Sequence, residues 1–223
     1  MSARRSRIWQ SFDNFELTMK DRLNLISAYN EWVQSYIDEG WSAFLMTFMF
    51  RPLSGTAFFK IQQMKKEIEH FYSDKLLHRI IRRPKFNGDA PVLFAFPDLP
   101  VRKKDKTSTI DAIVNDGLHF HTILLIPPRS RLSVPLDLYV ASIPEIYLRQ
   151  RKLDRIDIQS FYTENSFRVV DYCMKSLKGR LDYDNCILIL PKSSSECRDD
   201  VCQRERGVEG RRKSSMRSKK GRP

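Results

Sequence analysis

The sequence predicts an α+β fold in which a central antiparallel sheet is flanked by helices. Several short apolar segments rich in β-favouring residues occur along the chain, with segments of helical periodicity between them. Asn115-Asp116-Gly117 is a tight-turn signal, which indicates strands that pair locally and antiparallel. Hydrophobic residues form 41% of the chain and aromatic residues 11%, so a folded core is expected.

Two long helices are expected in the first third of the chain. Asp13-Asn14-Phe15-Glu16 has the form of a capping box, and Gly40 is a fitting stop signal, so residues 13–39 should form one or two helices. A second long helix is expected over residues 55–80. Apolar residues at spacings of three and four predict the core faces of these helices: Leu23, Ile26, Tyr29, Val33 and Ile37 in the first, and Ile61, Met64, Ile68, Phe71 or Tyr72, and Leu76 in the second.

The helical signals of the C-terminal half are shorter. Residues 135–150 are expected to be helical or irregular. Asn165-Ser166 can cap a helix over residues 167–178, which Gly179 would end. The core stripe expected for this helix comprises Phe167, Val170, Met174 and Leu177.

Six segments have the character of strands. Residues 41–50 are apolar on both faces, which predicts a central strand. Residues 109–114 and 118–126 flank the Asn-Asp-Gly turn and are expected to form a hairpin. The remaining candidates are residues 92–96, 155–161 (an edge strand) and 185–190, and a loop is expected over residues 97–108.

The charge of the chain is strongly positive and unevenly spread. The net charge is +12, and residues 192–223 hold eleven Lys/Arg against five Asp/Glu, or +6, which leaves +6 for the rest. Such a surplus favours a polyanionic partner, most simply nucleic acid, although a basic tail can also serve solubility alone. We expect a basic arm and helix over 1–40, a folded domain over 41–191 and a disordered basic tail over 192–223.

Cellular location and redox chemistry follow from what the sequence lacks. No segment approaches the length of a membrane span and the N-terminus has no apolar signal region, so a cytoplasmic protein without a membrane partner is expected. The four cysteines contain no CxxC pair, so free thiols and no zinc site are expected.

His119-Phe120-His121 is the first chemical signal. Side chains alternate along a strand, so the two imidazoles should share one face while Phe120 occupies the other. Two imidazoles placed in this way can share one metal ion. The alternative is a pair of partly buried histidines that only form hydrogen bonds with their neighbours.

Tyr172 and Lys175 are the second chemical signal. Tyr172 lies well round the expected helix from the Phe167/Met174 stripe, so core packing does not account for it. Lys175 is its i+3 neighbour, which brings the ammonium close to the phenol and would favour the phenolate. The alternative is an exposed helix with an incidental YxxK sequence.

Taken in order, these segments resemble the HUH endonuclease superfamily, which includes rolling-circle replication initiators, plasmid relaxases and related transposases. Phe44-Leu45-Met46-Thr47-Phe48 is similar to its hydrophobic first motif, His119-Phe120-His121 to its second, and Tyr172 to the helix-borne nucleophile of its single-tyrosine members. The resemblance covers residues 41–180 and implies a ferredoxin-like or RRM-like core.

The resemblance also implies a mechanism and partners. A divalent metal, Mn²⁺ or Mg²⁺, would be held by His119, His121 and a third ligand, for which Asp111 is the first candidate and Asp98 a second, whereas Asp116 is better explained as a turn residue. Tyr172 would nick single-stranded DNA or an origin hairpin through a 5′-phosphotyrosine, assisted by Lys175. This activity would initiate rolling-circle replication of a bacterial plasmid or phage-like element.

Further partners and competing functions remain open. The chain has no GxxxxGK[ST] motif and hence no fused helicase motor, and a host helicase is a candidate partner. The basic segments 82–85 and 102–106 and both termini would bind the phosphate backbone. The alternative functions are a non-catalytic nucleic-acid-binding protein on the same fold and a structural or interaction protein.

Overall fold

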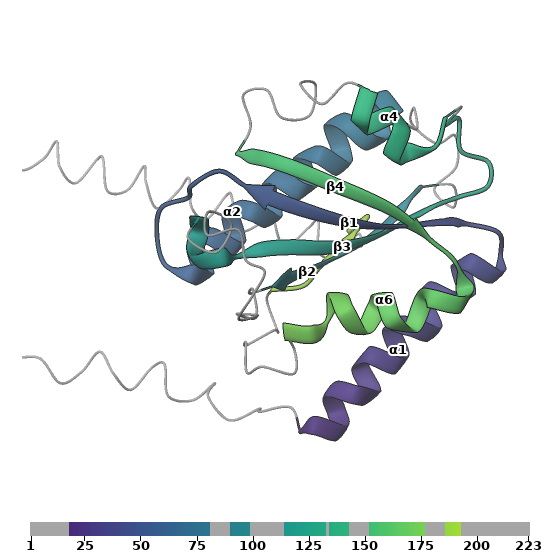
Figure 1. Cartoon of the computed structure of the whole chain (residues 1–223), viewed down its shortest axis with the longest axis horizontal. Coiled ribbons are helices and arrows are strands. Elements are labelled where there is room, and N and C mark those ends of the chain that lie inside the picture. The colour runs from purple at the N-terminus through teal and green to yellow at the C-terminus, as the bar shows by residue number, and fades with distance from the viewer. Residues whose placement is uncertain are drawn as a thin grey trace, which may run out of the picture. The chain divides into compact units, whose positions relative to one another are not determined.

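The computed structural model describes residues 18–80, 90–98, 114–132, 134–142, 152–176 and 186–192 (Figure 1). Its strands are β1 (Ser42–Phe50), β2 (Val92–Asp98), β3 (His119–Ile126), β4 (Leu153–Phe161) and β5 (Leu188–Leu190). Its helices are α1 (Met19–Asp38), α2 (Ala57–His70), the π-helix η1 (Phe71–Ile80), α4 (Leu136–Ser142) and α6 (Ser166–Cys173), with 3-10 turns η3 (Val114–Gly117) and η4 (Thr163–Asn165). The sheet order is β4-β1-β3-β2-β5 and every pairing is antiparallel, which confirms the α+β fold with a central antiparallel sheet.

The sheet has two covered faces, and the alternation of side chains in the central strand β3 separates them. Phe120 and Leu124 point to the face covered by α2 and η1, where they join Phe48 in one core cluster. Ile123 and Leu125 point to the other face, which α1 and α6 cover (Figure 1). His119 and His121 share this second face because they lie four and two residues before Ile123, respectively.

Helix α1 begins at Met19, within the range 13–39 that was expected to hold one or two helices. Thr18 caps it through a capping box, because its hydroxyl accepts from the Asp21 amide at 3.2 Å while the Asp21 carboxylate accepts from the Thr18 amide at 3.0 Å. The expected box at residues 13–16 lies outside the described residues. Ile26 and Val33 are buried as expected, but Leu23 is exposed, so that assignment to the core is wrong. Full burial on α1 starts only at Ile26.

The expected helix over residues 55–80 is confirmed as α2 followed without a break by η1. Its apolar stripe is buried at every expected position: Ile61, Met64, Ile68, Phe71, Tyr72 and Leu76. The strands expected at 41–50 and 92–96 correspond to β1 and β2, and β4 is an edge strand, as expected.

The hairpin expected between residues 109–114 and the histidine strand is wrong. Strand β3 pairs with β1 along one edge and with β2 along the other, over nearly its whole length. Neither edge is therefore open to a further strand. Residues 109–113 themselves lie outside the described residues. The tight turn is correct: Asn115 and Asp116 both adopt the left-handed conformation, with φ of 57° and 58°.

Helix α6 is shorter than the expected helix over 167–178, since it ends at Cys173. Asn165 precedes it but makes no capping hydrogen bond through its side chain. Phe167 is exposed, so its assignment to the core is wrong. Val170 and Met174 are buried as expected, and Leu177 lies outside the described residues. Ser166 and Cys173 complete the buried side of the helix, at four residues before and three after Val170. Ser166 tolerates burial because its hydroxyl donates to Gln34 on α1 at 2.7 Å.

Residues 191–223 separate from the rest of the chain as a second unit, of which only Pro191 and Lys192 are described. The basic segments 82–85 and 102–106 and both basic termini likewise lie outside the described residues, apart from Lys192. Within the part of the chain that is described, no helix is both long and apolar enough to cross a membrane.

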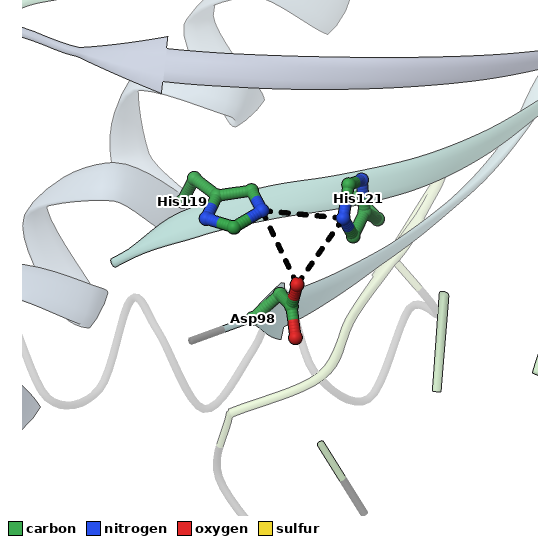
Figure 2. A group of neighbouring side chains, drawn as sticks. All are labelled: Asp98, His119 and His121. Atoms are coloured by element: carbon green, nitrogen blue, oxygen red, sulfur yellow. Dashed lines mark hydrogen bonds and ion pairs between the residues drawn. The ribbon is translucent and has the colours of Figure 1, made fainter. Parts of the chain in front are cut away.

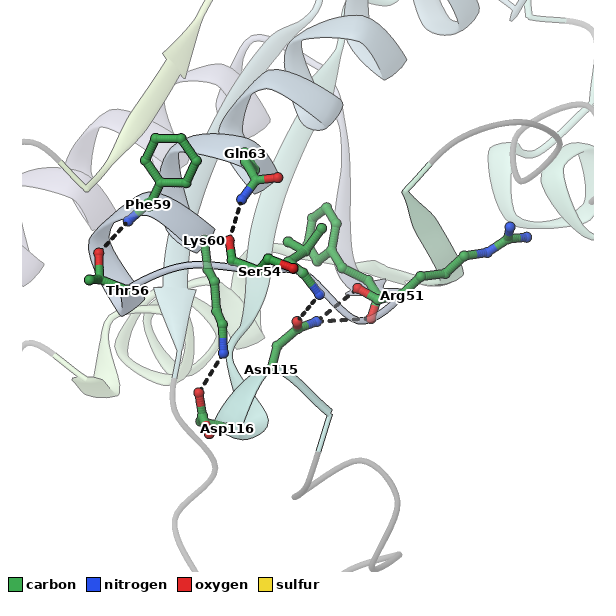
Figure 3. A network of polar contacts seen from close by, with 10 residues as sticks. Arg51, Ser54, Thr56, Phe59, Lys60, Gln63, Asn115 and Asp116 are labelled. Carbon is green, nitrogen blue, oxygen red and sulfur yellow. Dashed lines mark hydrogen bonds and ion pairs between the residues drawn. The ribbon is translucent and has the colours of Figure 1, made fainter.

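The side chain of Asn115 links the turn before β3 to the end of β1 through hydrogen bonds (Figure 3). Its amide oxygen accepts from the Leu53 amide at 2.7 Å, and its amide nitrogen donates to the carbonyls of Phe50 and Arg51 at 3.1 Å each. Beside it, the exposed Asp116 pairs with Lys60 of α2 at 2.6 Å. The turn thereby fixes the point from which His119 enters the sheet.

We expect Asn115→Ala to lower the free energy of unfolding by about 2–4 kcal/mol, because it removes three hydrogen bonds and places alanine in a left-handed conformation. Asn115→Gly should cost about 1 kcal/mol less, because glycine adopts that conformation without strain. Asp116→Asn, a control that removes only an exposed ion pair, should cost less than about 0.5 kcal/mol. Urea denaturation measures all three variants. Equal stability of the alanine and glycine variants would show that the conformation carries no strain.

Candidate metal centre

Asp98, His119 and His121 come together at one end of the sheet because of the strand register (Figure 2). Asp98 lies directly opposite His119 in the β2–β3 pairing, and Thr47 of β1 lies opposite His121 on the other side. The Asp98 Oδ2 atom is 3.2 Å from Nε2 of each histidine, and the two Nε2 atoms are 3.2 Å apart. Asp98 and His121 are buried, and His119 is half-buried.

Hydrogen bonds on the far side of each ring orient the two imidazoles. The Nδ1 atom of His119 lies 2.9 Å from the Gly117 carbonyl oxygen, which can only accept, so Nδ1 carries the proton. The Nδ1 atom of His121 lies 3.1 Å from the Thr47 hydroxyl. With its Nδ1 protonated, His119 turns the lone pair of Nε2 toward Asp98, and the Thr47 hydroxyl, which can accept as well as donate, permits the same tautomer in His121. Such partners on the second ring nitrogen are the usual support for metal-binding histidines.

The charge states of the group suit metal binding. Burial lowers the pKa of His121 and outweighs the neighbouring Asp98 carboxylate, so the imidazole favours its neutral, metal-binding form. Burial alone would raise the pKa of Asp98, but the polar groups around the carboxylate outweigh burial and hold its pKa well below the ordinary range. These groups belong to His119, His121, Lys175 and Ser176.

The residues present fit a divalent cation. Two imidazole nitrogens and a carboxylate oxygen lie within 4.8 Å of one another, and this donor set suits transition metals such as Mn²⁺ better than Mg²⁺, which prefers oxygen ligands. The buried Asp98 Oδ2 atom receives no well-directed hydrogen bond, although nitrogens surround it. A cation at this point would satisfy that oxygen.

The third member of the group is the acidic residue Asp98, which the sequence analysis gave only as an alternative. Asp111 lies outside the described residues. Asp116 is exposed and paired with Lys60, away from the group. The expected strand ended at Phe96, before Pro97, and therefore did not include Asp98, whereas β2 continues to Asp98. Pro97 is tolerated inside β2 because, among the described residues, the pairing with β5 extends only from Leu93 to Ala95 and does not reach Pro97.

Helix α6 and the residues after it place three further groups against this centre. The ring of Tyr172 lies against His121, with centroids 4.7 Å apart, and is 44% exposed. The Lys175 ammonium is 4.3 Å from the centre of the Tyr172 ring and 2.7 Å from Asp98 Oδ2. The Ser176 hydroxyl donates to the other oxygen of Asp98. Tyr172, Lys175 and the two histidines therefore lie together.

Two details were not foreseen from the sequence. Lys175 was expected near the phenol, but its ammonium lies over the ring face and forms an ion pair with Asp98. Cys173, next to Tyr172, points into the core, where burial raises the pKa of its thiol. That thiol is unsuited to act as a nucleophile.

No family model, no curated protein and no solved structure matches the chain. Functional inference therefore rests on the fold and on the geometry of this centre.

Proposed function

We propose that the chain is a metal-dependent endonuclease of the HUH type, which nicks and rejoins single-stranded DNA through Tyr172. One observation carries the proposal: an exposed tyrosine ring lies against a histidine of a buried Asp-His-His group. A nucleophile and a cation site at this spacing can act on one phosphate. The antiparallel α+β fold, which presents the histidines on its central strand, is consistent with the proposal.

The proposed reaction exchanges one phosphate ester for another. The phenol oxygen of Tyr172 attacks the scissile phosphorus, an O–P bond forms, and the bond from phosphorus to the 3′ oxygen breaks. The phenol loses its proton and the departing 3′ oxygen gains one. The DNA 5′-phosphate then remains on the tyrosine beside a free 3′-hydroxyl, and attack by a 3′-hydroxyl reverses the step and joins strands.

The surrounding residues have distinct roles in this proposal. A divalent cation held by Asp98, His119 and His121 would polarise the phosphate as a Lewis acid. The His119 Nδ1–H donates to the Gly117 carbonyl and the His121 Nδ1 atom contacts the Thr47 hydroxyl, and these two contacts orient both Nε2 atoms toward Asp98. Lys175 lies within 4.3 Å of the Tyr172 ring centre, where its charge would favour phenolate and phosphate oxygens.

The proposed substrate is single-stranded DNA or an origin hairpin of a plasmid or phage-like element, whose rolling-circle replication the nick would initiate. A net charge of +12 supports a polyanionic substrate. A host helicase would supply strand separation, and a cytoplasmic bacterial setting follows from the same proposal.

Cleavage polarity tests this function. Mixed single-stranded oligonucleotides, labelled at either end, are incubated with the full chain and Mn²⁺ and resolved on a denaturing gel. A 5′ label should appear on a shortened strand that a polymerase can extend, and a 3′ label on a slow, protein-linked band. Chelation of the metal should abolish both products. The reverse polarity, or cleavage that survives chelation, would contradict the proposal.

A non-catalytic DNA-binding protein on the same fold is the second candidate, and one observation favours it. Lys175 already forms an ion pair with the buried Asp98, so the carboxylate charge is compensated by the chain itself. In that case the centre is a buried polar network. If the chain binds DNA but gives no cleaved or protein-linked strand with any divalent metal tested, this second function is supported.

A further inference from the structure

Helix α6 carries large exposed side chains next to the candidate centre. We call Phe167, Arg168 and Tyr172 the outer surface of α6. Phe167 is 55% exposed and Tyr172 44%, and Arg168 is exposed as well. The buried stripe of the helix accounts for none of the three. Figure 1 shows α6 on one face of the sheet, next to α1.

Arg168 carries a charge that no described residue compensates, since it makes no hydrogen bond or ion pair within that part of the chain. Asp171, the one carboxylate of α6, is already engaged with a partner. An exposed, unpaired guanidinium offers a planar fork of donors that matches a phosphate group. The surface is therefore suited to an anion.

Arg168 also stands at a useful distance from Tyr172. The two residues are i and i+4 neighbours on the helix, which places their Cβ atoms about 5–6 Å apart on the same side. If Tyr172 receives one phosphate of an extended strand, Arg168 is within reach of the next one along the backbone.

Two exposed aromatic residues lie close to Arg168 in the sequence. Phe167 precedes it directly, and Tyr162, which follows β4, is 69% exposed. Leaving such rings in water forgoes the stabilisation that burial would give. Aromatic rings interleaved with a cation are the usual surface for single-stranded nucleic acid, because each base offers a flat face to stack on.

We infer that the outer surface of α6 binds the single-stranded DNA that adjoins the scissile phosphate. Arg168 holds the neighbouring phosphate and Phe167 stacks on a base. This inference rests on the proposed function and extends it, because it assigns the substrate strand a path along the helix that bears the nucleophile. The net charge of +12 favours DNA over a protein partner for this surface.

The test is the affinity of the full chain for a fluorescent mixed-sequence oligonucleotide, measured by anisotropy over a range of salt. All proteins carry Tyr172→Phe, so that no strand becomes covalently trapped. Arg168→Ala should weaken binding about tenfold and reduce the slope of log affinity against log salt by about 0.7, the loss of one phosphate contact. Phe167→Ala should weaken binding about fivefold or more without changing the slope. Arg168→Lys should leave the salt slope unchanged, because it keeps the charge. Phe167→Tyr should leave the affinity unchanged, because it keeps the aromatic ring.

Matched controls lie on α2, on the opposite face of the sheet. Lys66→Ala removes an exposed cation and Phe58→Ala an aromatic ring that is 58% exposed. Neither should change affinity more than about twofold. Equal losses for the α2 and α6 variants, or an unchanged salt slope for Arg168→Ala, would overturn the inference.

The outcome is separable from that of the proposed function. If the α6 variants lose affinity for DNA but the native chain forms no covalent adduct, the DNA-binding surface is supported and the nickase function is contradicted. If the native chain forms the adduct but the α6 variants bind DNA as tightly as Tyr172→Phe alone, the nickase function is supported and the DNA-binding surface is contradicted.

Discussion

Tyr172→Phe should reduce covalent adduct formation and nicking by at least about a thousandfold, because the substitution removes the nucleophilic oxygen and nothing else. The fold should persist, since the ring is 44% exposed and its contacts with His121 and Lys175 involve the ring. Affinity for Mn²⁺ and for single-stranded DNA should remain close to that of the native chain. A denaturing gel for the protein–DNA band, together with calorimetry and anisotropy, measures these quantities.

Two further variants make this result interpretable. Tyr162→Phe removes a hydroxyl from a more exposed tyrosine outside α6 and should leave the adduct unchanged. Lys175→Ala should slow cleavage while the adduct still forms, because Lys175 assists charge and does not supply the bond. An adduct that persists in Tyr172→Phe would assign the nucleophile to another residue.

Asp98→Asn should weaken Mn²⁺ binding by about a hundredfold or more, because it replaces a charged ligand by a neutral amide at the centre of the group. The pKa of Asp98 is held below its ordinary range, so the carboxylate is ionised throughout the neutral range and this loss should not depend on pH there. Calorimetric titration with Mn²⁺ measures the affinity. Mn²⁺ should also raise the Tm of the native chain and not that of the variant.

Controls separate the loss of a ligand from the loss of the fold. Asp116→Asn changes an exposed carboxylate next to the same strand and should bind Mn²⁺ as the native chain does. Phe120→Leu changes the opposite face of β3 and should lower the Tm without altering metal affinity. His119→Gln, at a less buried position, replaces Asp98→Asn if the latter fails to fold. Native affinity in Asp98→Asn or His119→Gln would remove the metal centre from the account.

The sequence was most informative where periodicity was strict. The stripe from Ile61 to Leu76 predicts one long helix because every third or fourth residue is apolar, and all of its members are buried. The alternation in His119-Phe120-His121 likewise predicts two imidazoles on one face, since a strand leaves no other choice. Local patterns of this kind fix which side a residue faces without reference to the rest of the chain.

The features that the sequence did not predict depend on contacts between segments that are far apart in the chain. Asp98 meets His119 only through the register of β2 on β3, which no local pattern encodes. The hairpin over 109–126 followed from the local turn signal, but β1 and β2 pair along the two edges of β3 and leave no edge for residues 109–114. Ser166 is buried through a hydrogen bond to Gln34, 132 residues away, so apolarity alone did not place this residue on the buried side of α6.

The most direct measurement of the central claim is mass spectrometry of the trapped adduct. The full chain is incubated with mixed single-stranded oligonucleotides and Mn²⁺, digested with protease and nuclease, and searched for nucleotide-modified peptides. The account predicts one modified residue, Tyr172, joined through a 5′-phosphate and absent when the metal is chelated. Modification of any other residue, or no modification under conditions in which the DNA is bound, would contradict it.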